Sequence, residues 1–246
     1  MTDKNLVLGG MLYEGKAKQV FTAGDGDLVL IHFKDDATAF NGEKKGQIEN
    51  KGVINNRLSA RFFRYLETEG IPTHFVALIN DRDMLCRRVE IIPLEVIVRN
   101  IVAGSLAKRT NQAEGTELGE PLVELTCKDD ARGDPLVTKE EAIAMGAAST
   151  EEIDRIRTLA LQVNEKLLPF LLEKKLKLVD FKLEFGRDRD GNLLLADEIS
   201  PDTCRFWDTE TGEKLDKDRF RRDLGGVKEA YIEVWNRIGD FRSSET

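Results

Sequence analysis

The order of hydrophobic and polar residues predicts helices in four parts of the chain. Apolar residues recur every four positions over residues 53–69, which predicts a helix there. A second helix is expected over residues 149–173, because Ser149 and Glu152 form a capping box ahead of an apolar stripe. The pattern predicts a short helix over residues 105–109 and a last amphipathic helix over residues 217–238, followed by a polar tail over residues 242–246.

Shorter apolar runs bounded by turn residues predict strands. The predicted strands lie at residues 28–33, 73–78, 84–92, 94–98, 176–185 and 193–196. Residues 43–50 and 111–137 are polar or rich in turn residues and predict loops. Because strands and helices cluster rather than alternate, the order favours an α+β fold. We place a boundary near residues 91–94, giving lobes at residues 1–92 and 93–246.

Composition and charge then narrow the class of protein. The chain has 246 residues, 37 basic and 45 acidic, a net charge of −8 and a pI of about 5.1. A nucleic-acid-binding domain typically has a pI above about 9, so no nucleic-acid partner is expected. No apolar run approaches the roughly 20 residues that span a membrane, and no secretory signal is visible, so we expect a cytoplasmic protein. Any anionic ligand must therefore meet a local cluster of lysine and arginine.

The most informative motif is Val179-Asp180-Phe181-Lys182-Leu183-Glu184-Phe185, in which every second residue is charged. Period-two geometry places the three charges on one face. A two-residue turn at Asp190-Gly191 would pair this strand with residues 193–197 and set Glu184 opposite Asp197. Opposed carboxylates are destabilising unless a cation lies between them, and Mg²⁺ is commonly held by carboxylates and nucleotide phosphates. The alternative is a solvated charged face in another register.

Further stretches carry candidate anion-binding chemistry. Tyr13-Glu14-Gly15-Lys16-Ala17-Lys18 combines a glycine with two lysines, although the P-loop pattern GxxxxGK[ST] is absent; an exposed basic strand is the alternative. Val98-Arg99-Asn100 and Ala103-Gly104-Ser105 offer an arginine and a helix-start serine for a phosphate or carboxylate. Arg205 lies in a polar turn after a strand, and such loop residues are more often structural. Taken by itself, the charged loop at residues 128–135 predicts only an exposed surface loop.

Taken together, these stretches resemble the SAICAR synthetase (phosphoribosylaminoimidazole-succinocarboxamide synthase) family of de novo purine synthesis. The match runs in family order over nearly the whole chain and continues through Ser200-Pro201-Asp202, Trp207-Asp208 and Asp216-Lys217-Asp218-Arg219-Phe220-Arg221. One departure is Thr203-Cys204 before Arg205, a variable position. The resemblance implies a two-lobed α+β fold of mainly antiparallel sheets with flanking helices and an ATP cleft between the lobes.

The same resemblance implies an activity. It is an ATP-dependent ligase that joins L-aspartate to the carboxylate of carboxyaminoimidazole ribonucleotide (CAIR), giving SAICAR, ADP and phosphate. ATP as co-substrate, Mg²⁺ and a cytoplasmic homodimer are implied with it. Two other classes stay open on the residues alone. A small-molecule kinase would transfer phosphate without aspartate, and a non-catalytic nucleotide-binding module would form no amide.

The resemblance also implies roles for individual residues. Those implied for ATP binding are Gly15, Lys16, Ala17, Lys18 and Lys182. Those implied for substrate binding are Arg99, Ser105, Asp202, Arg205 and Arg221. Those implied near the reacting groups are Lys128, Asp134 and Lys182, and those implied for Mg²⁺ are Glu184 and Asp197. Lysines, arginines and paired carboxylates suit activation by ATP, because phosphoryl transfer needs positioning and charge neutralisation more than a protein nucleophile.

Overall fold

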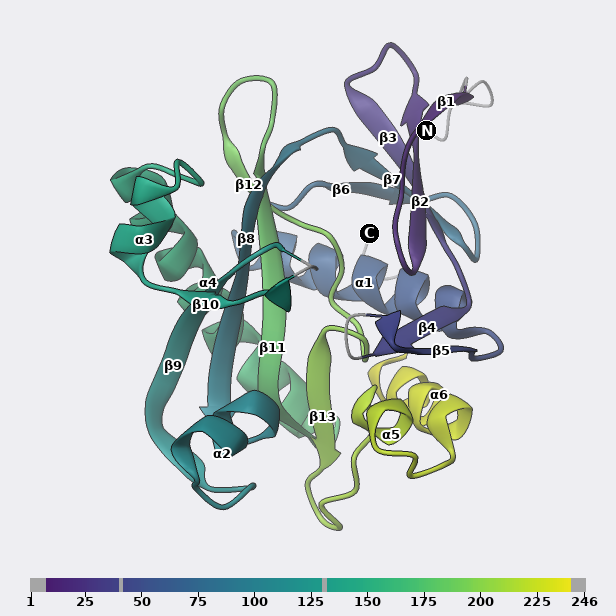
Figure 1. Ribbon diagram of the computed structural model, residues 1–246. Helices are drawn as coiled ribbons and strands as arrows, with labels where there is room; N and C mark the ends of the chain where they lie inside the picture. The colour runs from purple at the N-terminus through teal and green to yellow at the C-terminus, as the bar shows by residue number, and fades with distance from the viewer. Residues whose placement is uncertain (1–7, 40–41, 130–131, 240–246) are drawn as a thin grey trace.

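The computed structural model describes residues 8–39, 42–129 and 132–239, which form antiparallel sheets with flanking helices (Figure 1). The five-stranded sheet has the order β1-β2-β3-β7-β6. Its strands are β1 (Leu8–Glu14), β2 (Lys18–Ala23), β3 (Leu28–Phe33), β6 (Phe75–Leu78) and β7 (Asp83–Arg87). Beside it, β4 (Asp36–Ala39) and β5 (Lys44–Gln47) form a small two-stranded sheet.

The six-stranded sheet has the order β10-β9-β8-β11-β12, with β13 also paired to β11. Its strands are β8 (Glu90–Ile101), β9 (Glu117–Cys127), β10 (Leu136–Val137), β11 (Leu176–Arg187), β12 (Leu193–Ala196) and β13 (Cys204–Asp208). The long β8 runs without a break through the boundary placed at residues 92 and 93, and that division into lobes stays a prediction.

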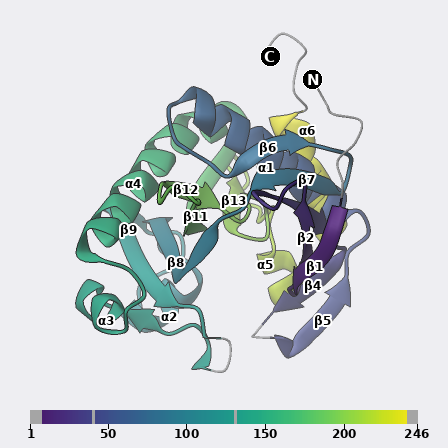
Figure 2. The ribbon, with the colours of Figure 1, turned by 90° about the horizontal axis from the view of Figure 1, so that it is seen from above.

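Helices cover both sheets. They are α1 (Lys51–Thr68), α2 (Gly104–Thr110), α3 (Lys139–Ala144), α4 (Thr150–Glu173), α5 (Asp218–Arg221) and α6 (Val227–Ile238). Figure 2 shows α4 along one side of the six-stranded sheet. The predicted capping box is confirmed at its start, where the Ser149 side chain accepts from the Glu152 N–H and the Glu152 carboxylate accepts from the Ser149 N–H. Among the residues described, no helix is both long and apolar enough to span a membrane.

One apolar core joins the two large sheets through α1. The ring of Phe62 on α1 lies 6.0 Å from that of Phe170 on α4 and 6.3 Å from that of Phe206 on β13. Phe181 and Leu183 of β11 are buried in the same core. Since side chains alternate along a strand, the charged residues of β11 face the opposite side, where the site lies.

Three element predictions were wrong. β9 lies within residues 111–137, and β5 lies within residues 43–50. The short polar β5 forms only by pairing with β4, and β9 by pairing with β8, which are contacts that local sequence does not show. The helix predicted over residues 217–238 is interrupted, because Gly225 and Gly226 adopt φ angles of +70° and +60°. The tail at residues 242–246 lies outside the described residues.

The predicted register of the β11–β12 hairpin was wrong by one position. Glu184 pairs with Ala196, not with Asp197, and Arg187 pairs with Leu193. The connection is therefore five residues long (188–192) rather than a two-residue turn at Asp190-Gly191. The Asp188 carboxylate closes this longer loop by accepting hydrogen bonds from backbone N–H groups within it.

Candidate active site

The predicted site residues of β8 and β11 meet on one face of the six-stranded sheet. The register between the two strands sets Asp180 opposite Arg99 and Glu184 opposite Glu95. The like-charged partner directly across from Glu184 is therefore Glu95. Because period two places all these side chains on the same side, a row of alternating charge runs along the sheet. We call its two parts the arginine end (Arg99, Ser105, Glu124, Asp180, Arg205 and Asp218) and the lysine end (Lys18, Glu95, Lys128, Lys182, Glu184, Asp197 and Glu198).

Arg99 is held on every side at the arginine end. Its Nε donates to Glu124 Oε2 at 2.6 Å, its Nη1 to Asp180 Oδ2 at 2.9 Å and its Nη2 to Ser105 Oγ at 3.0 Å. Only 3% of its surface is exposed, and a buried charge is tolerated when it is paired in this way. Because Ser105 accepts from Arg99, its own O–H remains available to donate to an anion.

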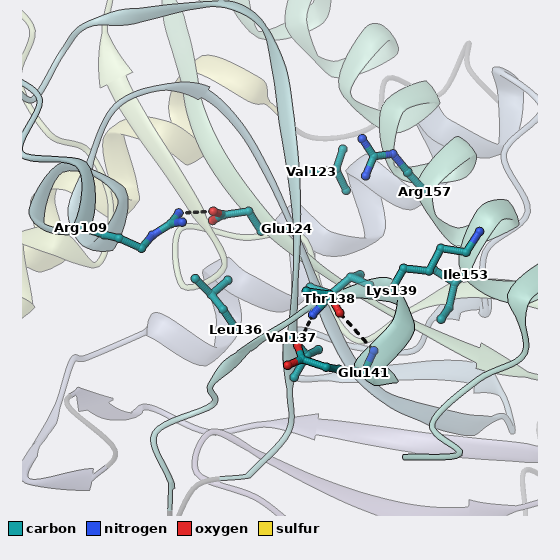
Figure 3. Close-up of a pocket in the computed structure, with 11 residues that line it drawn as sticks. Arg109, Val123, Glu124, Leu136, Val137, Thr138, Lys139, Glu141, Ile153 and Arg157 are labelled. Carbon is teal, nitrogen blue, oxygen red and sulfur yellow. Dashed lines mark hydrogen bonds and ion pairs between the residues drawn. The ribbon is translucent and has the colours of Figure 1, made fainter. Parts of the chain in front are cut away.

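Glu124 anchors a second arginine as well. Arg109 reaches from α2 to the other Glu124 oxygen (Figure 3). These residues line a cavity of about 350 Å³ between α2, the β9–β10 hairpin and the start of α3 and α4. With both oxygens engaged, Glu124 serves to fix Arg99 rather than to contact a ligand.

Arg205 joins β13 to β11 and α5. Its Nη1 lies 2.9 and 2.8 Å from the two oxygens of Asp180, and its Nε donates to Asp218 Oδ2 at 2.9 Å. Burial acts to raise the pKa of Asp218, but the charges and hydrogen bonds of Arg205 and Arg221 together outweigh burial, and the pKa falls to about 2. Gly104 makes the arrangement possible, because it has φ +53° and a Cβ there would lie 2.4 Å from Arg205 Nη2.

All five residues predicted to bind the substrate line one cavity of about 230 Å³. They are Arg99, Ser105, Asp202, Arg205 and Arg221. Lys182 and Lys217 line the same cavity. Its cations outnumber its carboxylates, Asp180 and Asp202, so the cavity suits an anion.

At the lysine end, each lysine contacts a carboxylate. Lys18, the first residue of β2, forms an ion pair with Asp197, and its Nζ lies 3.5 Å from Glu198 Oε1. In the same way Lys128 Nζ lies 2.6 Å from Glu184 Oε2, and Lys182 forms an ion pair with Glu95. The pair between Lys18 and Asp197 brings the five-stranded sheet to the six-stranded one.

The carboxylates of this end perturb one another. Burial raises the pKa of Glu184, and the nearby charge of Asp197 raises it further. Burial also acts to raise the pKa of Asp197, but the charge and hydrogen bond of Lys18 together with the charges of Lys182 and Lys128 outweigh burial, and the pKa is lowered. Glu198 is buried, its pKa is raised by burial, and its Oε2 has no hydrogen-bond partner among the residues described.

Glu184 and Asp197 fit a magnesium ion as a donor set. Carboxylate oxygens are the hard ligands that Mg²⁺ prefers, and a divalent cation would offset the Asp197 charge that, after burial, raises the pKa of Glu184. Within the described part of the chain, no three His, Cys, Asp or Glu residues form a complete metal site. Mg²⁺ commonly takes one or two carboxylates and completes its shell with phosphates and water, so two suffice.

The remaining predicted residues differ in placement. Gly15, Lys16 and Ala17 form the β1–β2 turn, closed by a bond of 2.8 Å from the Gly15 N–H to the Lys18 carbonyl. Lys16 is exposed in that turn, whereas the Lys18 side chain is mostly buried. Asp134 is not joined to the lysine end. Its carboxylate accepts from the Asp129 N–H at 2.9 Å and closes its own loop.

Sequence reasoning missed several partners of the predicted residues. Glu95 and Glu124 hold Lys182 and Arg99, Asp218 holds Arg205, and Lys51 Nζ lies 2.8 Å from Asp202 with 1% of its side chain exposed. One signal was available. Glu95 is the only charge in the apolar run Ile91-Ile92-Pro93-Leu94-Glu95-Val96-Ile97-Val98, and a charge in such a run needs a buried partner.

Paired lysines and carboxylates beside an arginine-lined cavity are typical of enzymes that act on phosphorylated substrates. The model of the SAICAR synthetase family matches residues 11–238, and the chain therefore belongs to that family. It is 58% identical over 228 residues, covering 93% of this chain and 97% of the relative, to phosphoribosylaminoimidazole-succinocarboxamide synthase from Clostridium botulinum (strain Alaska E43 / Type E3).

Solved structures agree with this membership. The enzyme of the same name from Ehrlichia chaffeensis superposes with a TM-score of 0.92 at 42% identity, covering 95% of this chain and 100% of that one. A SAICAR synthetase in complex with ADP superposes with a TM-score of 0.90 at 48% identity and the same coverage. The predicted family and the α+β class with mainly antiparallel sheets are confirmed.

Proposed function

We propose that this chain is an ATP-dependent ligase that joins L-aspartate to the carboxylate of CAIR, giving SAICAR, ADP and phosphate in purine biosynthesis. Membership of the family and the likeness to a SAICAR synthetase bound to ADP support the activity and the use of a nucleotide. The observation that carries the proposal in this molecule is the gathering of all five predicted substrate residues around one cavity. A CAIR phosphate and a cationic cavity are complementary in charge.

At the arginine end we assign the CAIR phosphate to Arg205 and Ser105. Arg205 Nη2 has no hydrogen bond within the described residues and is free to donate, as is the Ser105 hydroxyl. Arg99 is almost fully buried and acts by holding Ser105 and Asp180 in place. We include Asp202 and Arg221 in the same substrate cavity.

At the lysine end we assign the ATP phosphates to the turn of Gly15, Lys16 and Ala17 together with Lys18 and Lys182, in a cleft between the lobes. Glu184 and Asp197 would hold Mg²⁺, which supplies charge neutralisation at the transferred phosphoryl group when bound. We assign Lys128 to contact with the reacting carboxylate and phosphate, and its Nζ at 2.6 Å from Glu184 Oε2 and its 37% exposed side chain support this. Asp134 joins the assignment as a residue of the same loop.

The proposed order of events begins with attack of the CAIR carboxylate on the γ-phosphate of ATP. An acyl phosphate and ADP result. The aspartate amine then attacks the acyl carbon and phosphate leaves, so one amide bond forms for each ATP cleaved. Lysines neutralise the negative charge that three anionic reactants bring to one sheet face.

The test is to mix the protein with ATP, CAIR and L-aspartate, and to measure SAICAR and ADP with each substrate omitted in turn. The proposal expects repeated turnover to require both CAIR and aspartate, with one SAICAR per ADP, because without aspartate the reaction stops at the acyl phosphate. Repeated turnover to ADP and a phosphorylated product with no need for aspartate would indicate a kinase. Nucleotide binding with no product would indicate a non-catalytic module.

A homodimer and a cytoplasmic location also belong to the proposal, on the ground of the family resemblance. Light scattering during size-exclusion chromatography would measure the mass of the particle. A mass near 28 kDa, that of one chain of 27.7 kDa, would contradict the dimer.

A further inference from the structure

Asp202 lines the substrate cavity, but both oxygens of its carboxylate are already engaged. Its Oδ1 accepts from the Tyr231 hydroxyl at 2.6 Å, and its Oδ2 lies 2.8 Å from Lys51 Nζ and 3.4 Å from Lys217 Nζ. Only 4% of the Asp202 side chain is exposed. A buried carboxylate in this state has little capacity left for a ligand, and its charge would repel an anionic one. We therefore expect Asp202 to act through a neighbour.

Two of its three partners hold the carboxylate from outside the cavity. Lys51 is the first residue of α1 and Tyr231 lies in α6, and both side chains are almost fully buried. Neither is among the described residues that line the cavity. With an ammonium on Oδ2 and a phenol on Oδ1, the plane of the carboxylate is fixed, and with it the direction in which Oδ2 faces Lys217.

The third partner, Lys217, differs from Lys51 because it lines the cavity itself. Its backbone N–H donates to the Pro201 carbonyl at 3.0 Å, which holds it beside Asp202. Among the described residues, Asp202 is the only carboxylate that forms an ion pair with it, and that contact is long at 3.4 Å. Because an ammonium carries three N–H groups, Lys217 keeps donors for a phosphate or a carboxylate in the cavity.

We propose that Lys217 binds an anionic group of the substrate and that Asp202 is its positioning residue, held in turn by Lys51 and Tyr231. The inference rests on the proposed function, which places CAIR in this cavity. Lys51 offsets the Asp202 charge, so the carboxylate orients Lys217 without withdrawing it from a ligand. Tyr231 keeps Oδ1 occupied. Without the phenol, Oδ1 would be free to accept from Lys217 and would compete with the substrate for that ammonium.

The test combines two substitutions in a double-mutant cycle. Lys217→Met removes the ammonium and should fold, because Asp202 keeps its other two partners; Lys217→Gln replaces it if it does not. Tyr231→Phe removes only the hydroxyl. Tyr65→Phe is the matched control, since its hydroxyl donates to the Lys166 carbonyl at 3.1 Å, between α1 and α4. The Kd of the full-length protein for CAIR is measured by titration calorimetry, together with Tm.

We expect Lys217→Met to raise the Kd for CAIR about tenfold, as the loss of one charge-assisted hydrogen bond implies, and Tyr231→Phe about threefold. The double variant should bind CAIR as Lys217→Met does, because Tyr231 acts only through Lys217. Tyr65→Phe should lower Tm and leave the Kd unchanged.

Two kinds of failure are distinguishable. If the unaltered protein binds CAIR, an unchanged Kd in Lys217→Met would overturn the role of that lysine. An unchanged Kd in Tyr231→Phe, an additive loss in the double variant or an equal loss in Tyr65→Phe would overturn the positioning role. If the unaltered protein does not bind CAIR, the proposed function fails, and this inference with it.

Discussion

The arginine end and the lysine end lie on the same sheet face but hold their charges in different ways. Arg99 is 3% exposed, and its guanidinium is shared among two carboxylates and a serine. Lys128 and Lys182 each contact one carboxylate, and both side chains are 37% exposed. A guanidinium is a planar fork that fixes geometry, whereas an ammonium is a point charge on a flexible stem.

This difference teaches how one sheet can serve two tasks. A phosphate that only has to be recognised can be met by rigid groups fixed in advance, and the arginine end provides them. A phosphoryl group in transfer moves and redistributes its charge, so it is better met by cations that can exchange a carboxylate for the ligand. We therefore expect changes at the arginine end to affect KM for CAIR, and changes at the lysine end to affect turnover.

The largest effect should follow from removing a carboxylate of the lysine end. Asp197→Asn or Glu184→Gln should lower kcat by about 10²–10³-fold, since each removes charge from the place where the Mg²⁺–nucleotide is expected. Glu184→Gln should leave the fold intact, because burial and the nearby Asp197 charge already disfavour the Glu184 carboxylate, whereas Asp197→Asn removes the ion pair of Lys18 and should also lower Tm. Turnover measured over a range of Mg²⁺ concentrations tests this, with Tm as the control. Near-normal turnover of both variants at limiting Mg²⁺ would contradict the assignment of Mg²⁺ to Glu184 and Asp197.

A tenfold smaller effect, and a different kinetic signature, is expected at the arginine end. Arg205→Ala would leave Asp180 and Asp218 without their partner, so it should lose stability as well as substrate affinity. Gly104→Ala is the sharper variant. Its new Cβ displaces the Arg205 guanidinium while every charge remains.

For Gly104→Ala we expect KM for CAIR to rise about tenfold, as the loss of one charge-assisted hydrogen bond implies, with KM for ATP nearly unchanged. Arg205→Lys should behave similarly, because lysine cannot reproduce the fork. Steady-state kinetics with each substrate varied, alongside Tm, separates the possibilities. A fall in Tm with KM for CAIR unchanged would make Arg205 purely structural and the comparison between the two ends wrong.

The two lysines near the β1–β2 turn are predicted to differ, although they are two positions apart in sequence. Lys18 is mostly buried on Asp197, and Lys16 is exposed. Lys18→Met should therefore lower kcat/KM for ATP by about a hundredfold, as loss of a partly buried charge pair costs, and Lys16→Met by about tenfold or less. Both should leave KM for aspartate nearly unchanged. A larger change in KM for aspartate than in kcat/KM for ATP would contradict the assignment of these lysines to the ATP phosphates.

Local patterns predicted one face of the site but not its partners. The alternation in β11 predicts that Asp180, Lys182 and Glu184 share a face, and they do. The register failed because the Asp190-Gly191 pair resembled a two-residue turn, whereas Asp188 closes a longer loop. Glu124 lies on a strand that turn-rich composition concealed, so its pairing with Arg99 could not be anticipated.

The ion pairs and close approaches that could not be predicted from the sequence depend on contacts between residues far apart in the chain. Lys51 meets Asp202 across 151 positions only because α1 packs beside the segment after β12. The positive φ of Gly104 matters only because Arg205 lies against it. Spacing along the sequence shows which residues share a face, but sheet order and the approach of distant segments decide which charges become partners.

The smallest effect should come from an ion pair that belongs to neither end, which tests whether the kinetic losses arise at the site rather than from loss of any ion pair. Arg187 Nη2 donates to Glu152 Oε2 at 3.0 Å, and Glu152 also caps α4. Hydrogen bonds from Arg187, then from the Ser149 backbone, lower the pKa of Glu152 from 4.5 to about 2. Because Gln can also serve at this position of a capping box, Glu152→Gln should cost at most about 1 kcal/mol of stability at pH 7, from the lost ion pair with Arg187, with kinetics unchanged.

The pH dependence of that loss has a definite sign. Because the pKa of Glu152 is lower in the folded state, its carboxylate stabilises the protein above the unfolded pKa near 4.5, and the contribution is lost as pH falls toward 2. The difference in Tm between the unaltered protein and Glu152→Gln should therefore be constant from pH 7 to about 5 and narrow below 4.5. A Tm difference that grows as the pH falls would contradict the ion pair between Arg187 and Glu152. A change in kcat or in KM for CAIR at neutral pH would show that ion pairs outside the site influence turnover, and the contrast between the arginine and lysine ends would lose its basis.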